Sequence, residues 1–428
     1  MSARVRENVA WVVPAAAATA AIAKLGLVYF GSNDYLFEAL PAVNALVHGH
    51  LGGFFARAPI YGGSLLERAP FAFAPALWGG GELAVYRMLA LPCLLACPAL
   101  GLWLVARMRA GGQKRYVCAL ALALCVANPL MLLALQVGHP EELLGGALCV
   151  TAVLLAARGH AAWAGLALGV AIANKEWAVL ALGPVLLALP AKRILCATIV
   201  GAVGGTLLAP FELFAPGGFQ AGMHVVANPG SAIFQPWQLW WFLGRHEPGH
   251  IVYGLFGTKH GFRTAPGWVG IVGHPLIVGL VLPLTLAAWF RLRGSERAAV
   301  SPATNERLRE GAALLLLGLL LALRFMLDPL DYMYYALPCV LALTAWETLA
   351  LRRPPLFAVA VTAAMWVAQH WTVSLSPDAQ AAFFAAWSVP LAIALAVELY
   401  GPAVRLRART ASLGAASPPA SLDLGVQP

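Results

Sequence analysis

The sequence predicts an all-α integral membrane protein, and three observations support this fold class. Hydrophobic residues make up 61% of the 428 residues, charged residues only 11%, and the mean hydropathy is +0.76. The apolar runs are about 20 residues long, the length that crosses a bilayer as a helix. Short charged loops separate these runs. A soluble domain could not bury so much apolar surface, and a soluble β protein is therefore excluded.

The apolar runs predict about twelve membrane-spanning helices in one integral membrane domain, residues 1–403. The first run is too long for a signal peptide and lacks a clear cleavage site, so we expect it to remain as a helix. The Ser-, Ala- and Pro-rich tail, 404–428, is expected to be disordered. The predicted spans are 9–30, 83–106, 116–136, 142–157, 160–173, 176–190, 194–214, 267–290, 311–326, 333–350, 356–374 and 380–400.

Basic residues are concentrated in alternate loops, and this pattern predicts the orientation of the chain. With a cytoplasmic N-terminus, 19 of the 28 Lys and Arg residues fall in the inner loops and the two termini. This is the bias of the positive-inside rule. We therefore expect a multi-pass protein with both termini in the cytoplasm. The abundance of Ala and the preference for Arg over Lys indicate a GC-rich bacterial genome, and hence the bacterial inner membrane.

Composition and motifs also exclude several classes of function. Topology accounts for the net charge of +9, so nucleic acid is not expected as a partner. All seven cysteines lie inside apolar runs without ligand-like spacing, which predicts neither disulfides nor a zinc site. The sequence has no Gly-rich phosphate-binding loop of the kind that binds nucleotides.

Two loops on the predicted outer side are long, about 31–82 and about 215–266. We expect both to contain helices that lie on the membrane surface, with the tryptophans of 235–241 at headgroup depth or serving simply as anchors. In the first loop, a helix is compatible with Pro41 only if this residue lies in a first turn. Its predicted apolar face holds Leu36, Leu40, Val43 and Val47, and its polar face holds Asp34, Glu38, Ala45 and His48.

Four polar clusters are predicted to lie on the same outer side. Asp34 begins the first long loop, either as a helix N-cap or as a functional carboxylate, with Glu38 on the same face. The other three clusters are His139 with Glu141 and Glu142; Lys175 within Asn174-Lys175-Glu176-Trp177; and Arg324 with Asp328, Asp331 and Tyr332. Ionisable groups at a membrane boundary are costly and indicate function. Lys175 suits either an anionic ligand or the membrane interface.

These elements together resemble the GT-C superfamily of polyprenyl-phosphate-sugar glycosyltransferases, and most closely the bacterial mannosyltransferases of the glycosyltransferase 87 type. The resemblance covers most of residues 9–350. It is carried by the acidic residue after the first helix, the Gly-His-Pro-Glu loop at 138–141, the 174–177 hairpin, and Arg324 followed by Tyr334, Tyr335, Leu337 and Pro338.

The resemblance implies an inverting transferase that uses a lipid-linked sugar donor at the outer, periplasmic face, with a glycan or lipid as acceptor. Asp34 would be the catalytic base, and Glu38, Glu141, Asp328 and Asp331 would support it or contact the acceptor. Arg324, Lys175 and His139 would bind the donor phosphate, for which the bidentate guanidinium of Arg324 is well suited. Asn33 precedes Asp34 where many members of the superfamily have a second acidic residue. No metal ligands are therefore predicted, no cofactor is expected with certainty, and a divalent cation is left open.

Two alternatives belong to other classes of protein. One is a 12-helix secondary transporter or lipid flippase, which would need polar groups near the middle of the bilayer. In this sequence such groups are concentrated at the outer rim instead, and no internal repeat is evident. The other alternative is a non-catalytic subunit of cell-envelope synthesis.

Overall fold

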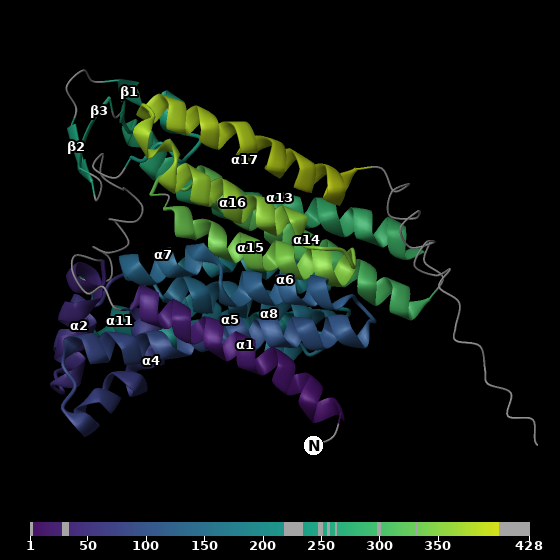
Figure 1. The fold of residues 1–428 in the computed structure, drawn as a ribbon, viewed down its shortest axis with the longest axis horizontal. Coiled ribbons are helices and arrows are strands. Elements are labelled where there is room, and N and C mark those ends of the chain that lie inside the picture. Colours follow the sequence, from purple (N-terminus) through teal and green to yellow (C-terminus); the bar gives the residue numbers. More distant parts are fainter. Residues whose placement is uncertain are drawn as a thin grey trace, which may run out of the picture.

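A computed structural model describes residues 3–27, 34–217, 234–246, 251–254, 257–261, 263–297, 301–330 and 332–401. Within these ranges nearly all ordered elements are helical, which confirms the all-α prediction (Figure 1). The predicted disorder of the tail, 404–428, lies outside the described residues, as does Asp331.

The first half of the chain forms an N-terminal helix, a group of short helices over 35–78, and a set of packed longer helices. The elements are α1 (Ala3–Gly26), η1 (Tyr35–Ala39), α2 (Leu40–Val47), α3 (Leu51–Arg57), α4 (Gly62–Ala72), η2 (Ala74–Trp78), α5 (Glu82–Ala110), α6 (Arg115–Val126), α7 (Pro129–Val137), α8 (Glu141–Ala157), α9 (Ala161–Asn174), η3 (Glu176–Ala181), α10 (Leu182–Ala188) and α11 (Arg193–Phe214).

The second half begins with short strands and continues with further long helices. The strands pair antiparallel, β1 with β4 and β2 with β3. The elements are η5 (Trp241–Leu243), β1 (Arg245–His246), β2 (Ile251–Gly254), β3 (Gly257–His260), β4 (Arg263–Thr264), α13 (Gly267–Arg297), α14 (Pro302–Leu327), η6 (Met333–Ala336), α15 (Leu337–Ala345), η7 (Trp346–Ala350), α16 (Leu356–His370), η8 (Thr372–Ser374) and α17 (Pro377–Tyr400).

Seven helices among the described residues are long and apolar enough to cross a membrane. They are Val9–Gly26, Glu82–Ala110, Arg115–Val137 (α6 and α7 counted as one interrupted span), Arg193–Phe214, Gly267–Glu296, Ala303–Leu327 and Pro377–Tyr400. The other five predicted spans correspond to shorter or interrupted helices, namely α8, α9, η3 with α10, η6 with α15 and η7, and α16. Twelve crossings therefore stay a prediction.

The predicted span 116–136 is broken in the middle. Asn128 separates α6 from α7, and its side-chain oxygen accepts a hydrogen bond from the backbone N–H of Leu130 at 2.9 Å. Pro129 follows at the first position of α7, where its missing N–H costs nothing. A cap and a proline thus divide one apolar run into two helices.

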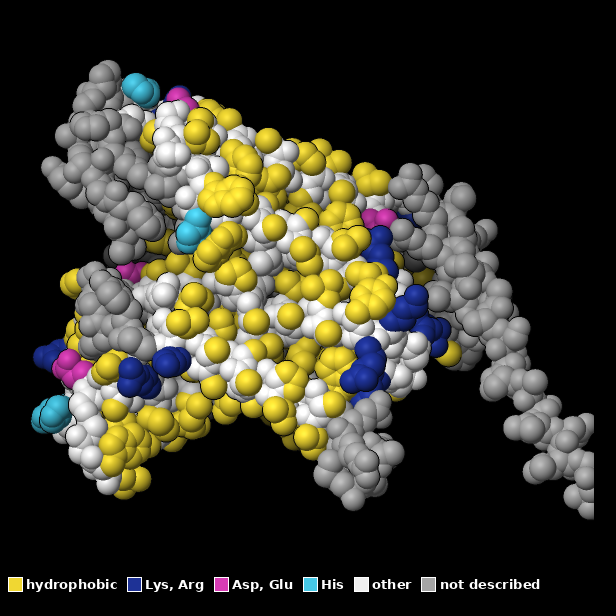
Figure 2. Space-filling view, viewed as in Figure 1, with side chains coloured by type: hydrophobic (Ala, Val, Ile, Leu, Met, Phe, Trp, Pro, Cys, Tyr) yellow, Lys and Arg dark blue, Asp and Glu magenta, His cyan; other side chains and the backbone are white. Residues whose placement is uncertain are grey.

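Helix α8 defines two ends of the bundle. It is almost wholly buried, and its 17 residues place its two ends about 25 Å apart. Near its C-terminus, Arg107 is paired with Glu310 at 2.9 Å, close to Arg158. We call this the basic end. The N-terminus lies there in Figure 1, and Figure 2 shows Lys and Arg side chains there, others near the opposite end, and hydrophobic side chains along the flank. The opposite end, where α8 begins with Glu141, is called the site end.

The first long loop forms helices, but the predicted apolar face is displaced. The buried positions are Tyr35, Ala39, Ala42, Val43, Ala45 and Leu46, whereas Leu36, Leu40 and Val47 are only half-buried. Residues 35–39 form a π-helical turn, which is wider than an α-turn and shifts the register. Ala45 is therefore buried, contrary to its predicted place on the polar face. Pro41 lies in the first turn of α2, as a helix here requires.

The described part of the second long loop docks onto helices. Trp241 is fully buried, and its indole N–H donates to Asp378 at the start of α17 over 2.7 Å. The indole N–H of Trp240 donates to the carbonyl of Leu327 at 2.6 Å. Trp241 therefore packs inside the protein and does not anchor in lipid, while the headgroup depth of this tryptophan group stays a prediction.

Candidate functional site

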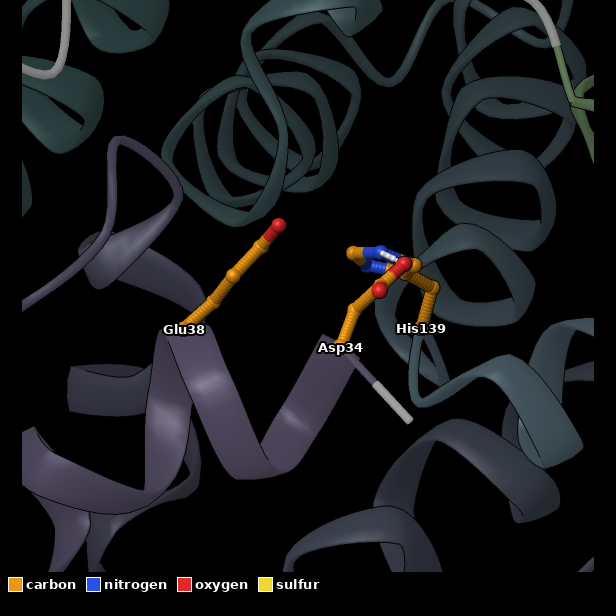
Figure 3. A group of neighbouring side chains, drawn as sticks. All are labelled: Asp34, Glu38 and His139. Carbon is orange, nitrogen blue, oxygen red and sulfur yellow. Dashed lines mark hydrogen bonds and ion pairs between the residues drawn. The ribbon is translucent and has the colours of Figure 1, made fainter. Parts of the chain in front are cut away.

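Asp34 directs its carboxylate at an imidazole instead of capping a helix. Its side chain makes no cap hydrogen bond, and its own backbone is helical. The Asp34 Oδ2 atom lies 3.1 Å from Nε2 of His139, in the loop between α7 and α8 (Figure 3). About a third of the Asp34 side chain, 36%, is exposed. The N-cap interpretation is therefore wrong, and Asp34 is an accessible carboxylate with a defined partner.

Gly138 allows this contact. Its φ of +107° lies in the left-handed region, which disfavours residues with a Cβ. A Cβ atom at this position would also lie only 2.6 Å from the backbone nitrogen of Tyr35. The glycine thus lets the loop before His139 touch the start of η1. This close approach brings two segments about 100 residues apart in the sequence together.

The imidazole of His139 lies between two carboxylates. Its Nδ1 atom is 2.6 Å from Oε1 of Glu141, while Nε2 faces Asp34. Burial and the nearby charge of Lys175 lower the pKa of His139. The Glu141 charge and the hydrogen bonds to Asp34 and Glu141 outweigh both and raise this pKa to about 9. Nearby acidic partners thus favour the imidazolium form.

Glu141 is a buried carboxylate whose charge is balanced by cations. The ammonium of Lys175 donates to Glu141 Oε1 at 3.0 Å, and the guanidinium of Arg68 lies 3.8 Å from Oε2. Burial alone would raise the pKa of Glu141, but Lys175 and His139 hold it well below its usual range. Only 1% of Glu141 is exposed, so the structure places it behind His139 and away from solvent.

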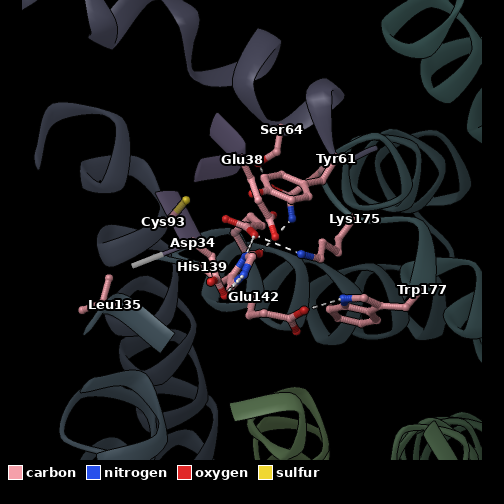
Figure 4. A network of polar contacts seen from close by, with 12 residues as sticks. Asp34, Glu38, Tyr61, Ser64, Cys93, Leu135, His139, Glu142, Lys175 and Trp177 are labelled. Carbon is pink, nitrogen blue, oxygen red and sulfur yellow. Dashed lines mark hydrogen bonds and ion pairs between the residues drawn. The ribbon is translucent and has the colours of Figure 1, made fainter. Parts of the chain in front are cut away.

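Glu38 joins the cluster through Tyr61. The Tyr61 hydroxyl donates to Glu38 Oε2 at 2.6 Å, and the ammonium of Lys175 lies 4.2 Å from the centre of the Tyr61 ring (Figure 4). Glu38 itself is exposed. Figure 3 shows Glu38 and Asp34 projecting from the same side of their helix. One ligand atom from each of Asp34, Glu38 and His139 lies within 4.8 Å of the others, so these three residues could hold a metal ion.

Helices α4 and α9 fix the back of the site. The Ser64 hydroxyl donates to Asn174 Oδ1 at 2.7 Å, and Asn174 Nδ2 donates to the carbonyl of Glu141 at 2.9 Å. Gly63 lies so close to the carbonyl of Ala173 that a Cβ atom would lie 2.2 Å from its oxygen. This tight packing positions Lys175, the residue after α9, beside Glu141.

Arg324 is close to this network but has its own partner. It donates two hydrogen bonds to Glu142, at 3.0 and 3.2 Å, and only 2% of it is exposed. Its guanidinium lies 4.4 Å from the ring centre of Trp177 and 4.2 Å from that of Tyr335. Its charge is therefore used inside the protein, which leaves the predicted phosphate contact without structural support.

Asp328 also has a separate partner. Its Oδ1 lies 3.1 Å from Nε2 of His274 on α13 and accepts the backbone N–H of Leu330 at 2.9 Å. These contacts tie α13 to the end of α14. The structure therefore brings Asp34, Glu38, His139, Glu141 and Lys175 into one contact network and leaves Asp328 outside it.

Two members of the network, Arg68 and Tyr61 of the first long loop, were not singled out in the sequence. Tyr334, which the sequence named only as part of the motif after Arg324, stacks on His139 with ring centres 5.4 Å apart. Arg68 carried one usable signal, because an arginine beside Ala69-Pro70-Phe71-Ala72 is an ionisable residue in an apolar segment. Tyr61 carried no such signal, since a tyrosine in a loop is ordinary.

The accessible and buried parts of the site differ in charge. The carboxylates of Asp34 and Glu38 reach the surface, whereas Arg68, Lys175 and Arg324 are buried and paired with acidic residues. The arrangement can therefore accept a proton or bind a cation at its surface. Comparisons with protein-family models, with curated proteins and with solved structures find no match for this chain.

Proposed function

We propose that this protein is a membrane glycosyltransferase that moves a sugar, most simply a mannose-like hexose, from a polyprenyl phosphate to a glycan or lipid acceptor. The observation that carries this proposal is the Asp34 carboxylate, partly exposed and held by His139, which Glu141 supports from behind. A carboxylate fixed in this way at a membrane boundary is suited to act as a general base.

In the proposed reaction, the acceptor hydroxyl attacks C1 of the sugar. The bond between C1 and the phosphate oxygen breaks, and the phosphate leaves with the electron pair. A new bond forms between C1 and the acceptor oxygen, and the hydroxyl proton passes to Asp34. Attack opposite the leaving phosphate inverts C1. His139 and Glu141 orient the Asp34 carboxylate, and general-base catalysis of this kind contributes about 10²–10⁴-fold to a rate.

The proposed sidedness follows from the two ends of the bundle. The Arg107–Glu310 pair and Arg158 lie at one end of α8, and the Asp34 network lies at the other, where α8 begins. By the positive-inside rule, the site would face the periplasm and both chain termini the cytoplasm. The position of the network at one end, and not midway along the helices, favours a transferase over the transporter alternative.

A transfer assay with the purified protein tests the proposal. A radiolabelled polyprenyl-phosphate hexose is incubated with the protein and a membrane-glycan extract, and labelled product is separated from donor. Asp34→Asn should lower the transfer rate at least about 100-fold with normal membrane insertion. Glu82→Gln, a change to an exposed carboxylate at the same end, is the matched control and should transfer like wild type. Wild-type activity in Asp34→Asn would remove Asp34 from the reaction.

A further inference from the structure

Asp34, Glu38 and His139 present two carboxylates and one imidazole to a shared space (Figure 3). The two acidic residues come from one segment, since Asp34 directly precedes η1 and Glu38 lies within it. His139 comes from the loop before α8, more than 100 residues later. Three potential ligand atoms from two separate elements thus converge at a partly accessible point.

The second nitrogen of His139 is already held as it is in metal sites. Histidines that bind metals usually donate their other ring N–H to a carboxylate, which fixes the tautomer and the ring orientation. Here Nδ1 lies 2.6 Å from the buried carboxylate of Glu141, and the ammonium of Lys175 lies 3.0 Å from the same oxygen. Binding of a metal ion displaces the Nε2 proton of the imidazolium form, and with Nδ1 still protonated toward Glu141 the Nε2 lone pair then points toward Asp34.

The two accessible carboxylates of the site, Asp34 and Glu38, also favour a bound cation. A donor phosphate that reached Asp34 and Glu38 would meet two carboxylates, while Lys175 and Arg324 are buried and paired with Glu141 and Glu142. A divalent ion between the carboxylates and the phosphate would replace this repulsion with attraction.

We propose that Asp34, Glu38 and His139 bind one divalent metal ion of the first transition row, because the imidazole disfavours Mg²⁺ and Ca²⁺, and Mn²⁺ serves as the probe. Asp34 has two oxygens, so one can bind the ion while the other accepts a proton. Glu38 has one oxygen on Tyr61 and a second available for the ion. The binding of the ion stands on these ligands alone, whereas its role in holding the donor phosphate rests on the proposed function.

Metal binding is tested first without any substrate. Metal-free purified protein is titrated with Mn²⁺, and free Mn²⁺ is followed by electron paramagnetic resonance. Wild type should bind one ion per chain. Glu38→Gln should weaken binding at least about 10-fold, by analogy with losses measured around metal sites. Since Glu38 is exposed, this variant should fold normally, and Glu82→Gln should bind like wild type. Competition by Zn²⁺, Mg²⁺ and Ca²⁺ then ranks the ions, and a site that prefers Mg²⁺ or Ca²⁺ would overturn the assignment to a transition metal.

The outcomes separate this inference from the proposed function. Transfer that continues at full rate in excess chelator, with no Mn²⁺ bound, would overturn the metal site and leave the transferase intact. Mn²⁺ binding that depends on Glu38, in a protein that transfers no sugar, would support the metal site and overturn the transferase. Equal Mn²⁺ binding by wild type and Glu38→Gln would place the ion elsewhere and overturn the proposed ligands.

Discussion

Arg324 donates two hydrogen bonds to the carboxylate of Glu142, at 3.0 and 3.2 Å, inside the protein. This pair connects α14 to the start of α8. An arginine near the outer end of a predicted helix is an attractive ligand for phosphate, but here its charge is matched by an adjacent carboxylate and its planar group is enclosed by Trp177 and Tyr335. The geometry favours a role in holding the site together.

The first prediction separates these two roles of Arg324. Arg324→Ala leaves the Glu142 carboxylate buried without its cation and should destabilise the protein by about 3–5 kcal/mol. Thermal unfolding in detergent measures this loss. In the double variant Arg324→Met with Glu142→Leu, no uncompensated charge remains, and most of the stability should return. A double variant as stable as wild type that has lost donor binding would restore the phosphate role.

The sequence predicted the helices well because long apolar runs, charged loops and prolines act locally. The sequence-based predictions were wrong where tertiary contacts determine which face of a helix is buried and which residues pair. The apolar face of 34–48 was displaced by a π-turn over residues 35–39, whose first residue lies against Gly138. The convergence of Asp34, His139 and Lys175 was predicted from sidedness alone. Which cation pairs with which carboxylate could not be predicted, since Glu141 and Glu142 are adjacent in sequence and yet pair with Lys175 and Arg324 respectively.

The second prediction concerns the close contact at Gly138. Gly138→Ala should disrupt the hydrogen bond between Asp34 and His139, because the new Cβ would press on the backbone of Tyr35. We expect transfer to fall at least about 10-fold. Gly112→Ala is the matched control, since Gly112 has a φ of +73° with no atom within 4 Å of its would-be Cβ. If transfer falls equally in Gly138→Ala and Gly112→Ala, the loss is due to backbone strain and not to the contact between Gly138 and Tyr35.

The third prediction tests how Glu38 is held. Tyr61→Phe removes the 2.6 Å hydrogen bond to Glu38 and keeps the ring on which Lys175 lies. A hydrogen bond to a charged group contributes about 1.5–3 kcal/mol to stability, so Tyr61→Phe should lower the free energy of unfolding by no more than this amount. Transfer should fall about 10-fold or more, because Glu38 loses its fixed position. Tyr61→Leu would also remove the ring and should lower stability. Unchanged transfer in Tyr61→Phe would argue that Glu38 needs no fixed position.

The fourth prediction tests sidedness. The seven native cysteines are all buried, so background labelling by a membrane-impermeant maleimide should be low. In intact spheroplasts, Glu38→Cys at the site end should be labelled from outside. Lys114→Cys, exposed at the basic end, should be labelled only after the membrane is opened. The reverse pattern would invert the proposed topology and move the reaction to the cytoplasm.

The last prediction concerns Glu67, a carboxylate of α4 whose two oxygens are buried without a hydrogen-bond partner among the described residues. Burial raises its pKa from 4.5 to about 8, against the opposing effect of Arg68. Because the folded-state pKa is the higher one, the folded protein binds this proton more tightly than the unfolded chain. The resulting stability is fully present below about pH 4.5 and is lost as the pH rises through about 8.

Glu67→Gln keeps the shape of the protonated side chain and cannot ionise. Its free energy of unfolding should therefore match that of wild type near pH 5 and exceed it at pH 9, where the difference should be on the order of 1–3 kcal/mol. Thermal unfolding across this pH range measures the effect, with Glu82→Gln as the exposed control that should follow wild type. A wild-type protein whose stability advantage over Glu67→Gln grew with pH would show that the Glu67 carboxylate is charged and paired in the folded state, since only a lowered pKa gives that sign.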